Sequence, residues 1–385
     1  MNRKLIFFTL IILLLIILTG ILLPVPLPVS ISNKQAFHDS VQMSYSGEGT
    51  LFVCSANGDT LLSGENVIIM NAPLETAADR ERTVLIYPPP DFDRKEVYPV
   101  LYLLHGFAAH PTFWIENLIP SIERAVSNGE LPPLIAVIPD GSLSGNGTDD
   151  PDTSIDERGG CWYINSNRTR YEDFLLEDLP AFVRTIAIIS DDPDNIVIAG
   201  SSMGGFGAAY YALRYPERFR NAGLFYPALD LRYAVRGNRL KAYEADKYKP
   251  ITRDNPFRIV NKAAGSGILG LTDKWCFYPV FNSDSAAGVF WTEDLPVWQR
   301  QKDVNPADIL LIDNPDLTGS RFFIQTGSSD DFNFDDHQKV VLPMIRQAGG
   351  TVEPQDTIIP DGRHNWTSIE PSVPDFIDWL ADTFE

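Results

Sequence analysis

The sequence predicts an α/β fold in which a mostly parallel sheet carries helices on both faces. Five nearly continuous apolar segments, rich in β-branched residues, are typical of strands buried on both sides. Amphipathic helical patterns lie between most of them, as the connections between parallel strands require. The strands are expected at residues 98–106, 134–141, 195–201, 221–229 and 321–330.

Other elements follow from the same periodicities. Helices are expected at 119–129 and 172–188, and a strand at 82–90 that three prolines end. Residues 50–70 predict short strands, broken at Asn57-Gly58 and Ser63-Gly64. Residues 231–320 have weak periodicity but many aromatic side chains, which favours an insertion on the sheet over a polar linker.

The N-terminus predicts a membrane anchor. Arg3 and Lys4 precede an apolar run from Leu5 to Leu23, which as a helix spans about 28 Å, close to the thickness of a bilayer core. We therefore expect a transmembrane signal-anchor at 1–23, an extended proline-containing linker at 24–45, and a catalytic domain at 46–385 outside the cytoplasm. The alternative is a cleaved secretory signal, for which Ser30-Ile31-Ser32 is a faint cleavage pattern.

Charge and cysteine content limit the partners. The net charge of −20 argues against nucleic acid as a partner and favours a solubilising acidic surface. Three cysteines are too few for a disulfide scaffold. Cys161 and Cys276 are the suggested pair, with three small buried hydrophobic residues as the alternative.

A candidate nucleophile lies between a predicted strand and a predicted helix. Gly200-Ser201-Ser202-Met203-Gly204 matches the pattern G-x-S-x-G. In that context a sharp turn raises the side chain of the middle residue above the sheet, which favours Ser202 over Ser201 as the nucleophile. The alternative is a glycine-rich packing turn without chemistry.

A serine nucleophile needs a base and an orienting acid, which in this architecture follow it in the order Asp or Glu, then His. Two of the five histidines follow Ser202. His364 lies in a loop after a short apolar strand, where the base is expected, whereas His337 is expected to be solvated at a helix start. The acid should come just past the strand at 321–330, which makes Asp330 the first choice over Asp331.

The oxyanion of an ester intermediate needs backbone donors. We expect them to be the N–H of Met203, directly after the nucleophile, and the N–H of Phe107, in the loop after the strand at 98–106. His105 in that loop is expected to be structural. The acidic loop at 140–160 offers several carboxylates, which are ligands that bind calcium ions. Its composition is more typical of a solvated active-site loop. No cofactor and no catalytic metal are expected, since zinc-binding motifs are missing from the sequence.

Eight short motifs follow one another between Arg82 and Glu385, apart from the insertion: YPVLYLLHGF, IAVIPDG, WYINS, YEDFLLEDLPAFV, GSSMGG, YPERF, GSSDDF and GRHNW. In this order they show a resemblance to the esterase D-like family of α/β-hydrolases. It implies an α/β-hydrolase fold, the triad Ser202, Asp330 and His364, and the oxyanion donors Phe107 and Met203. Trp162 and Tyr163 of WYINS and Trp366 of GRHNW are expected to contact the substrate.

Two departures leave the substrate open. The insertion is long, and LFYPAL stands where the family often has a Ser-Gly pair. The family includes S-formylglutathione hydrolases, feruloyl and acetylxylan esterases, and mycolyltransferases. The first hypothesis is therefore a membrane-anchored serine ester hydrolase that acts on a small or polysaccharide-linked ester. An acyltransferase with the same triad is the second, and a non-catalytic carbohydrate-binding domain the third. Trp275, Trp291 and Trp298 would either stack on a substrate or form a small core of the insertion.

Overall fold

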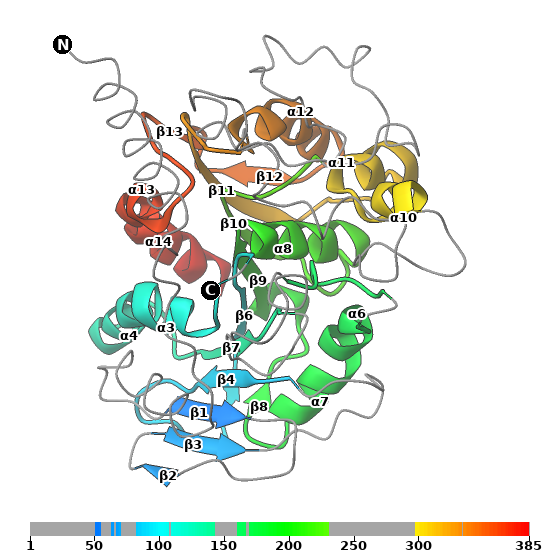
Figure 1. Cartoon of the computed structure of the whole chain (residues 1–385). Coiled ribbons are helices and arrows are strands. Elements are labelled where there is room, and N and C mark those ends of the chain that lie inside the picture. The colour runs from blue at the N-terminus through cyan, green and yellow to red at the C-terminus, as the bar shows by residue number, and fades with distance from the viewer. Residues whose placement is uncertain are drawn as a thin grey trace, which may run out of the picture.

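The computed structural model describes residues 82–384 apart from 108, 143–159, 167–168, 231–296 and 333, together with three short strands between residues 51 and 70. In this part of the chain, a large mixed sheet crosses the molecule and helices pack on both of its sides (Figure 1). Its strands are β1 (Leu51–Cys54), β2 (Ser63–Gly64), β3 (Val67–Met70), β4 (Val84–Tyr87), β6 (Val100–Leu104), β7 (Ile135–Pro139), β9 (Ile196–Ser201), β10 (Asn221–Phe225), β11 (Arg321–Gly327), β12 (Thr351–Glu353) and β13 (Ile358–Ile359).

The centre of the sheet is parallel, as expected. The strand order is β12-β11-β10-β9-β6-β7-β4-β1-β3-β2, with β13 beside β11. Every neighbouring pair from β7 across to β12 is parallel, whereas β4 runs antiparallel to both β7 and β1. The short strands β5 (Val97–Tyr98) and β8 (Ile188–Ile189) form a separate parallel pair. Because parallel strands end at the same edge, the loops after β6, β9, β10 and β11 meet there.

The two faces of the sheet carry two hydrophobic cores. Along β6, Val100, Tyr102 and Leu104 face one core, and Leu101 and Leu103 face the other, as strand alternation requires. The first core lies under α6 (Tyr171–Asp173), the π-helical turn η1 (Phe174–Asp178), α7 (Leu179–Val183), α8 (Met203–Arg214) and α12 (Phe334–Gln347). The second lies under α3 (Thr112–Asn117), α4 (Ile119–Asn128) and α14 (Val373–Thr383), on the opposite side in Figure 1.

Most predicted elements are found, with three corrections. The strand expected at 221–229 ends at Phe225, because Tyr226 takes a positive φ of 36° that ends the extended backbone. Ser63-Gly64, expected as a break, forms the two-residue strand β2 by pairing with β3. The helix expected at 172–188 ends at Val183, before β8.

The end of the predicted insertion is helical and packs on the domain. It contains α10 (Val297–Val304), α11 (Pro306–Asp308) and the π-helical turn η5 (Ile309–Asp313). The Ala307 N–H donates to the carbonyl of Leu229, and Arg214 of α8 pairs with Asp313. The rest of the insertion, including Trp275 and Trp291, lies outside the described residues, and so do the predicted anchor at 1–23 and linker at 24–45. None of the helices in the described residues has the length and apolar character that crossing a membrane requires.

The remaining helical segments are short. They are η2 (Pro193–Asn195), which leads into β9, α13 (Trp366–Ile369), which follows the His364 loop, and η6 (Glu370–Ser372), which leads into α14.

Candidate active site

The candidate nucleophile lies on a strained turn between β9 and α8. Ser202 has φ 54° and ψ −112°, outside the helical and extended regions that ordinary residues occupy. The turn needs the flanking glycines: a Cβ on Gly200 would lie 2.2 Å from the Gly204 carbonyl oxygen, and one on Gly204 would lie 1.9 Å from the Leu104 oxygen. Ser201 is buried, with 1% of its surface exposed. The backbone therefore presents Ser202, and not Ser201, at the edge where the strands end.

Three side chains from three separate segments meet at this turn. The imidazole of His364 lies with Nε2 2.9 Å from the Oγ of Ser202 and Nδ1 2.6 Å from Oδ2 of Asp330. A carboxylate only accepts, so Nδ1 carries the ring proton and Nε2 accepts from the serine hydroxyl. The structure thus brings together Ser202, His364 and Asp330, the three residues expected from the sequence.

The two neighbouring aspartates differ sharply in environment. Asp330 is fully buried, and its second oxygen, Oδ1, accepts the backbone N–H groups of Phe332 (2.8 Å) and Phe334 (3.1 Å). Asp331 turns to the surface instead, where it pairs with the guanidinium of Arg363. Because both oxygens of Asp330 are held, its carboxylate is fixed toward His364, and Asp331 does not share that position.

The two expected oxyanion donors lie on segments that pack against each other. A Cβ on Gly160 would meet the Met203 sulfur at 2.3 Å and a ring carbon of Phe107 at 3.5 Å, so both side chains lie beside Gly160. A Cβ on Gly106 would lie 3.4 Å from the Ser202 Cβ. The loop before Phe107 therefore passes next to the serine. Met203 also begins the twelve-residue helix α8, whose N-terminal dipole favours negative charge at this point.

Three aromatic rings surround the imidazole of His364. The ring centroids of Tyr226 and Phe332 each lie 4.6 Å from the centroid of His364, and that of Phe334 lies at 5.2 Å. Tyr226 comes from LFYPAL, the segment that departs from the family pattern, and it is 5% exposed. Sequence reasoning missed these contacts, because ring packing against His364 depends on the positive φ of Tyr226 and on the turn after Asp330.

Two of the three residues expected to contact the substrate are buried instead. Trp162 and Tyr163 are 1% and 0% exposed. Positive φ angles of 56° and 60° turn their side chains into the core, where Tyr163 fills the space over Gly141 and Gly207. They therefore support the site from beneath and present no surface to a substrate. Trp366 is partly exposed but packs edge-to-face on Phe113, Trp114 and Phe225.

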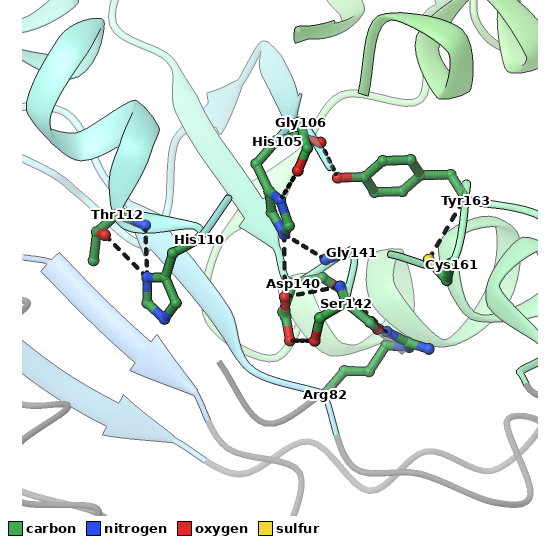
Figure 2. Close-up of polar contacts among 10 residues, drawn as sticks. All are labelled: Arg82, His105, Gly106, His110, Thr112, Asp140, Gly141, Ser142, Cys161 and Tyr163. Carbon is green, nitrogen blue, oxygen red and sulfur yellow. Dashed lines mark hydrogen bonds and ion pairs between the residues drawn. The ribbon is translucent and has the colours of Figure 1, made fainter. Parts of the chain in front are cut away.

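A buried polar cluster lies around His105, which comes two residues before Phe107 in the chain (Figure 2). The imidazole of His105 lies 3.1 Å from the carboxylate of Asp140, which also accepts from the backbone (3.0 Å) and hydroxyl (2.6 Å) of Ser142. Arg82 donates to the carbonyl oxygens of Asp140 and Ser142 and lies over the ring of Tyr171. Burial raises the pKa of Asp140, but its interactions with His105 and Ser142 outweigh burial and hold that pKa below its ordinary value.

A histidine and a cysteine considered from the sequence are both buried. His337, expected to be solvated, is fully buried, and its Nδ1 accepts the backbone N–H groups of Leu229 and Asp230, each at 3.2 Å. Cys161 is a buried free thiol whose pKa is raised by burial to about 12. Cys276 itself lies outside the described residues, and so does the acidic loop from 143 to 159.

Fold and site together define a class: an α/β protein with a serine on a strand–helix turn and a histidine and an aspartate in hydrogen-bonding reach. Residues 76–367 match the family described as "Putative esterase", and the chain belongs to this family. It is a serine esterase, as its resemblance to the esterase D-like group predicted.

Two solved structures share the fold. A ferulic acid esterase is 17% identical with a TM-score of 0.56, over 88% of this chain and 100% of that one. An S-formylglutathione hydrolase from Agrobacterium tumefaciens is 17% identical with a TM-score of 0.52, over 82% of this chain and 94% of that one. At this identity the likeness concerns the fold, and it confirms the predicted fold of the described domain.

Proposed function

We propose that the protein hydrolyses carboxylic esters through an acyl-enzyme on Ser202, with His364 as general base and Asp330 as the orienting acid. The continuous hydrogen-bonded chain of Ser202 Oγ, His364 and Asp330 carries this proposal, with its two links of 2.9 Å and 2.6 Å. A serine hydroxyl is a weak nucleophile until a base removes its proton. The hydrogen bond from His364 to Asp330 holds the imidazole in the tautomer that can take this proton.

The proposed reaction has two halves. The Ser202 Oγ attacks the ester carbonyl as His364 takes its proton, and the tetrahedral oxyanion accepts hydrogen bonds from the N–H groups of Phe107 and Met203. His364 then gives that proton to the leaving alcohol, which leaves an acyl group on Ser202. A water molecule, deprotonated by His364, attacks the acyl carbonyl in turn, and the acid and free enzyme result.

The substrate proposed is a small or polysaccharide-linked ester. The test is a panel of p-nitrophenyl, feruloyl and acetyl-sugar esters, assayed on the detergent-solubilised protein with and without added sugar acceptors. Release of free acid, lost in Ser202→Ala, supports hydrolysis. Transfer of the acyl group to the added sugar in preference to water would support the second hypothesis, an acyltransferase. Binding of sugars without turnover of any ester would support the third hypothesis, a non-catalytic carbohydrate-binding domain.

We further propose that residues 1–23 anchor the protein in a membrane with the catalytic domain outside the cytoplasm. The apolar run from Leu5 to Leu23 after Arg3 and Lys4 supports this. After alkaline carbonate washing the protein should remain in the membrane pellet with its N-terminal residues intact. A mature chain that begins near Asn33 and is free in the medium would assign a cleaved signal instead.

A further inference from the structure

The peptide between Gly106 and Phe107 has its direction fixed by the carbonyl oxygen of Gly106. A peptide unit is planar and trans, so its C=O and N–H point in opposite directions and turn together. The Gly106 oxygen accepts a hydrogen bond from Nδ1 of His105 at 2.9 Å and another from the Ala109 N–H at 3.1 Å. Whatever holds this oxygen therefore also aims the Phe107 N–H.

The imidazole of His105 is held at both of its nitrogens. Since the Gly106 oxygen only accepts, Nδ1 carries a proton, and Nε2 lies 2.7 Å from the Gly141 backbone nitrogen and 3.1 Å from an oxygen of Asp140. The ring is 1% exposed and lies against the Asp140 carboxylate, as Figure 2 shows. Both ring nitrogens are engaged with groups in the polar cluster, so the ring cannot rotate without losing a buried hydrogen bond.

The backbone around His105 has no room to shift. The hydroxyl of Tyr163 donates to the His105 carbonyl oxygen at 2.8 Å. On the other side, the carbonyl of Leu104 lies so close to the first turn of α8 that a Cβ on Gly204 would come within 1.9 Å of it. The loop is thus fixed by two successive carbonyls, those of His105 and Gly106, while the N–H of Phe107 follows next in the chain.

We propose that His105 is a positioning residue for the oxyanion hole: its Nδ1–H holds the Gly106–Phe107 peptide so that the Phe107 N–H faces the developing oxyanion. The inference rests on the proposed role of Phe107 as an oxyanion donor. A donor to the carbonyl also polarises the peptide, which makes its N–H a stronger donor in turn. His105 touches neither substrate nor Ser202 Oγ in this role and acts only through the peptide.

A matched pair of substitutions tests the role. His105→Asn places an amide N–H where Nδ1 lies and keeps the donor to Gly106, whereas His105→Phe keeps a ring but has no donor. Both lose the contacts that Nε2 makes with Asp140 and Gly141. We expect His105→Phe to lower kcat by about 10- to 100-fold with KM nearly unchanged, since loss of a whole oxyanion donor costs about 10²–10³. His105→Asn should stay within about fivefold of wild type.

Inhibition by phenylboronic acid separates positioning from folding, because a boronate on Ser202 presents a tetrahedral oxygen to the oxyanion hole. The affinity for the boronate should fall in His105→Phe by the same factor as kcat/KM and should be unchanged in His105→Asn. Titration with a fluorophosphonate gives the number of active sites to which each measurement is referred. Asn221→Leu removes the side-chain hydrogen bonds of a buried residue at the opposite ends of the strands. It controls for general destabilisation and should leave boronate affinity unchanged.

Two results would overturn the role of His105. One is unchanged boronate affinity per titrated site in His105→Phe, and the other is equal loss in His105→Asn and His105→Phe. Failure of the proposed function is a different outcome, because it would appear as full ester turnover in Ser202→Ala.

Discussion

Two histidine–aspartate pairs lie near the candidate site, and only one of them has the placement of a catalytic base. In the pair His364–Asp330, Nδ1 faces the carboxylate at 2.6 Å and Nε2 faces the Ser202 hydroxyl. In the pair His105–Asp140, Nε2 lies 3.1 Å from the carboxylate and 2.7 Å from the backbone nitrogen of Gly141, while Nδ1 donates to a carbonyl. The first ring therefore has a nitrogen free to exchange a proton with a reactant, whereas the second has its nitrogens engaged with the backbone.

The two pairs differ in their exposure to solvent as much as in their hydrogen bonds. The His364 side chain is 9% exposed and lies at the end of the strands, where a substrate arrives, whereas His105 is 1% exposed. A histidine beside an aspartate is thus not a sign of catalysis by itself. What the second nitrogen faces decides whether the pair moves a proton or holds a loop in place.

The sharpest test of the comparison removes the hydroxyl that His364 faces. Ser202→Ala should lower ester turnover by about 10⁴–10⁶ in kcat, because no acyl-enzyme can form. Steady-state hydrolysis of a p-nitrophenyl ester measures it, with circular dichroism to show the fold is kept. Ser201→Ala is the matched control, since Ser201 is buried one residue earlier. A larger loss in Ser201→Ala would move the nucleophile by one residue.

The next test removes the charge of the acid but keeps its shape. Asp330→Asn should lower kcat by about 10⁴, because an amide at this place donates toward Nδ1 and favours the wrong tautomer of His364. KM should change little. In contrast, Asp140→Asn should lower kcat far less, because the carboxylate of Asp140 faces no ring nitrogen that exchanges a proton with substrate. Equal losses of kcat in the two variants would show that the two histidine–aspartate pairs do not have different roles in the reaction.

Asp140 should instead appear in the pH dependence of stability. Its pKa is lowered in the folded protein, so its ionised form contributes stability that is complete above the unfolded pKa of about 3.9 and is lost as the pH falls below that value. Asp140→Asn should lower the free energy of unfolding by about 2 kcal/mol at pH 7, and by less at pH 3. Urea unfolding at both values measures this.

The control for that experiment is an exposed carboxylate. Asp313 pairs with Arg214 at the surface, with 43% of its side chain exposed. Asp313→Asn should change the free energy of unfolding little at either pH, as is usual for surface ion pairs. An Asp140→Asn penalty that is the same at pH 7 and pH 3 would contradict the assignment of a depressed pKa to this group.

The sequence was sufficient to predict the three side chains that meet at the candidate site, because each of them is tied to a local pattern. Ser202 lies in a pentapeptide between an apolar strand and a helix, and Asp330 lies three residues after Gly327, the last residue of β11. The parallel order of the strands then brings their loops together. The alternation of strands and helices likewise predicted the central sheet, since buried parallel strands have a near-continuous apolar signature.

Burial that depends on partners distant in sequence could not be predicted. His337 is near acidic residues at the start of α12, a pattern typical of solvated positions, yet residues 229 and 230 cover it. Trp162 and Tyr163 face inward because positive φ angles and the open space over Gly141 and Gly207 direct them there. Neither the backbone angle nor the opposing glycine is visible in the local sequence.

The smallest expected effect concerns Asp331, the neighbour of the buried acid. Its carboxylate bonds with Arg363 at the surface, and Arg363 directly precedes His364, so the ion pair joins the acid loop to the histidine loop. The Arg363 side chain is 56% exposed, and exposed pairs of this kind are weak because water competes for both charges. Asp331→Asn should therefore lower kcat by less than about fivefold. Salt screens such charges, so wild type and variant should converge when kcat is measured at rising ionic strength. A loss near that of Asp330→Asn would instead show that the two aspartates act as one acidic cluster, and a loss that salt does not reduce would show that Asp331 acts through geometry and not through charge.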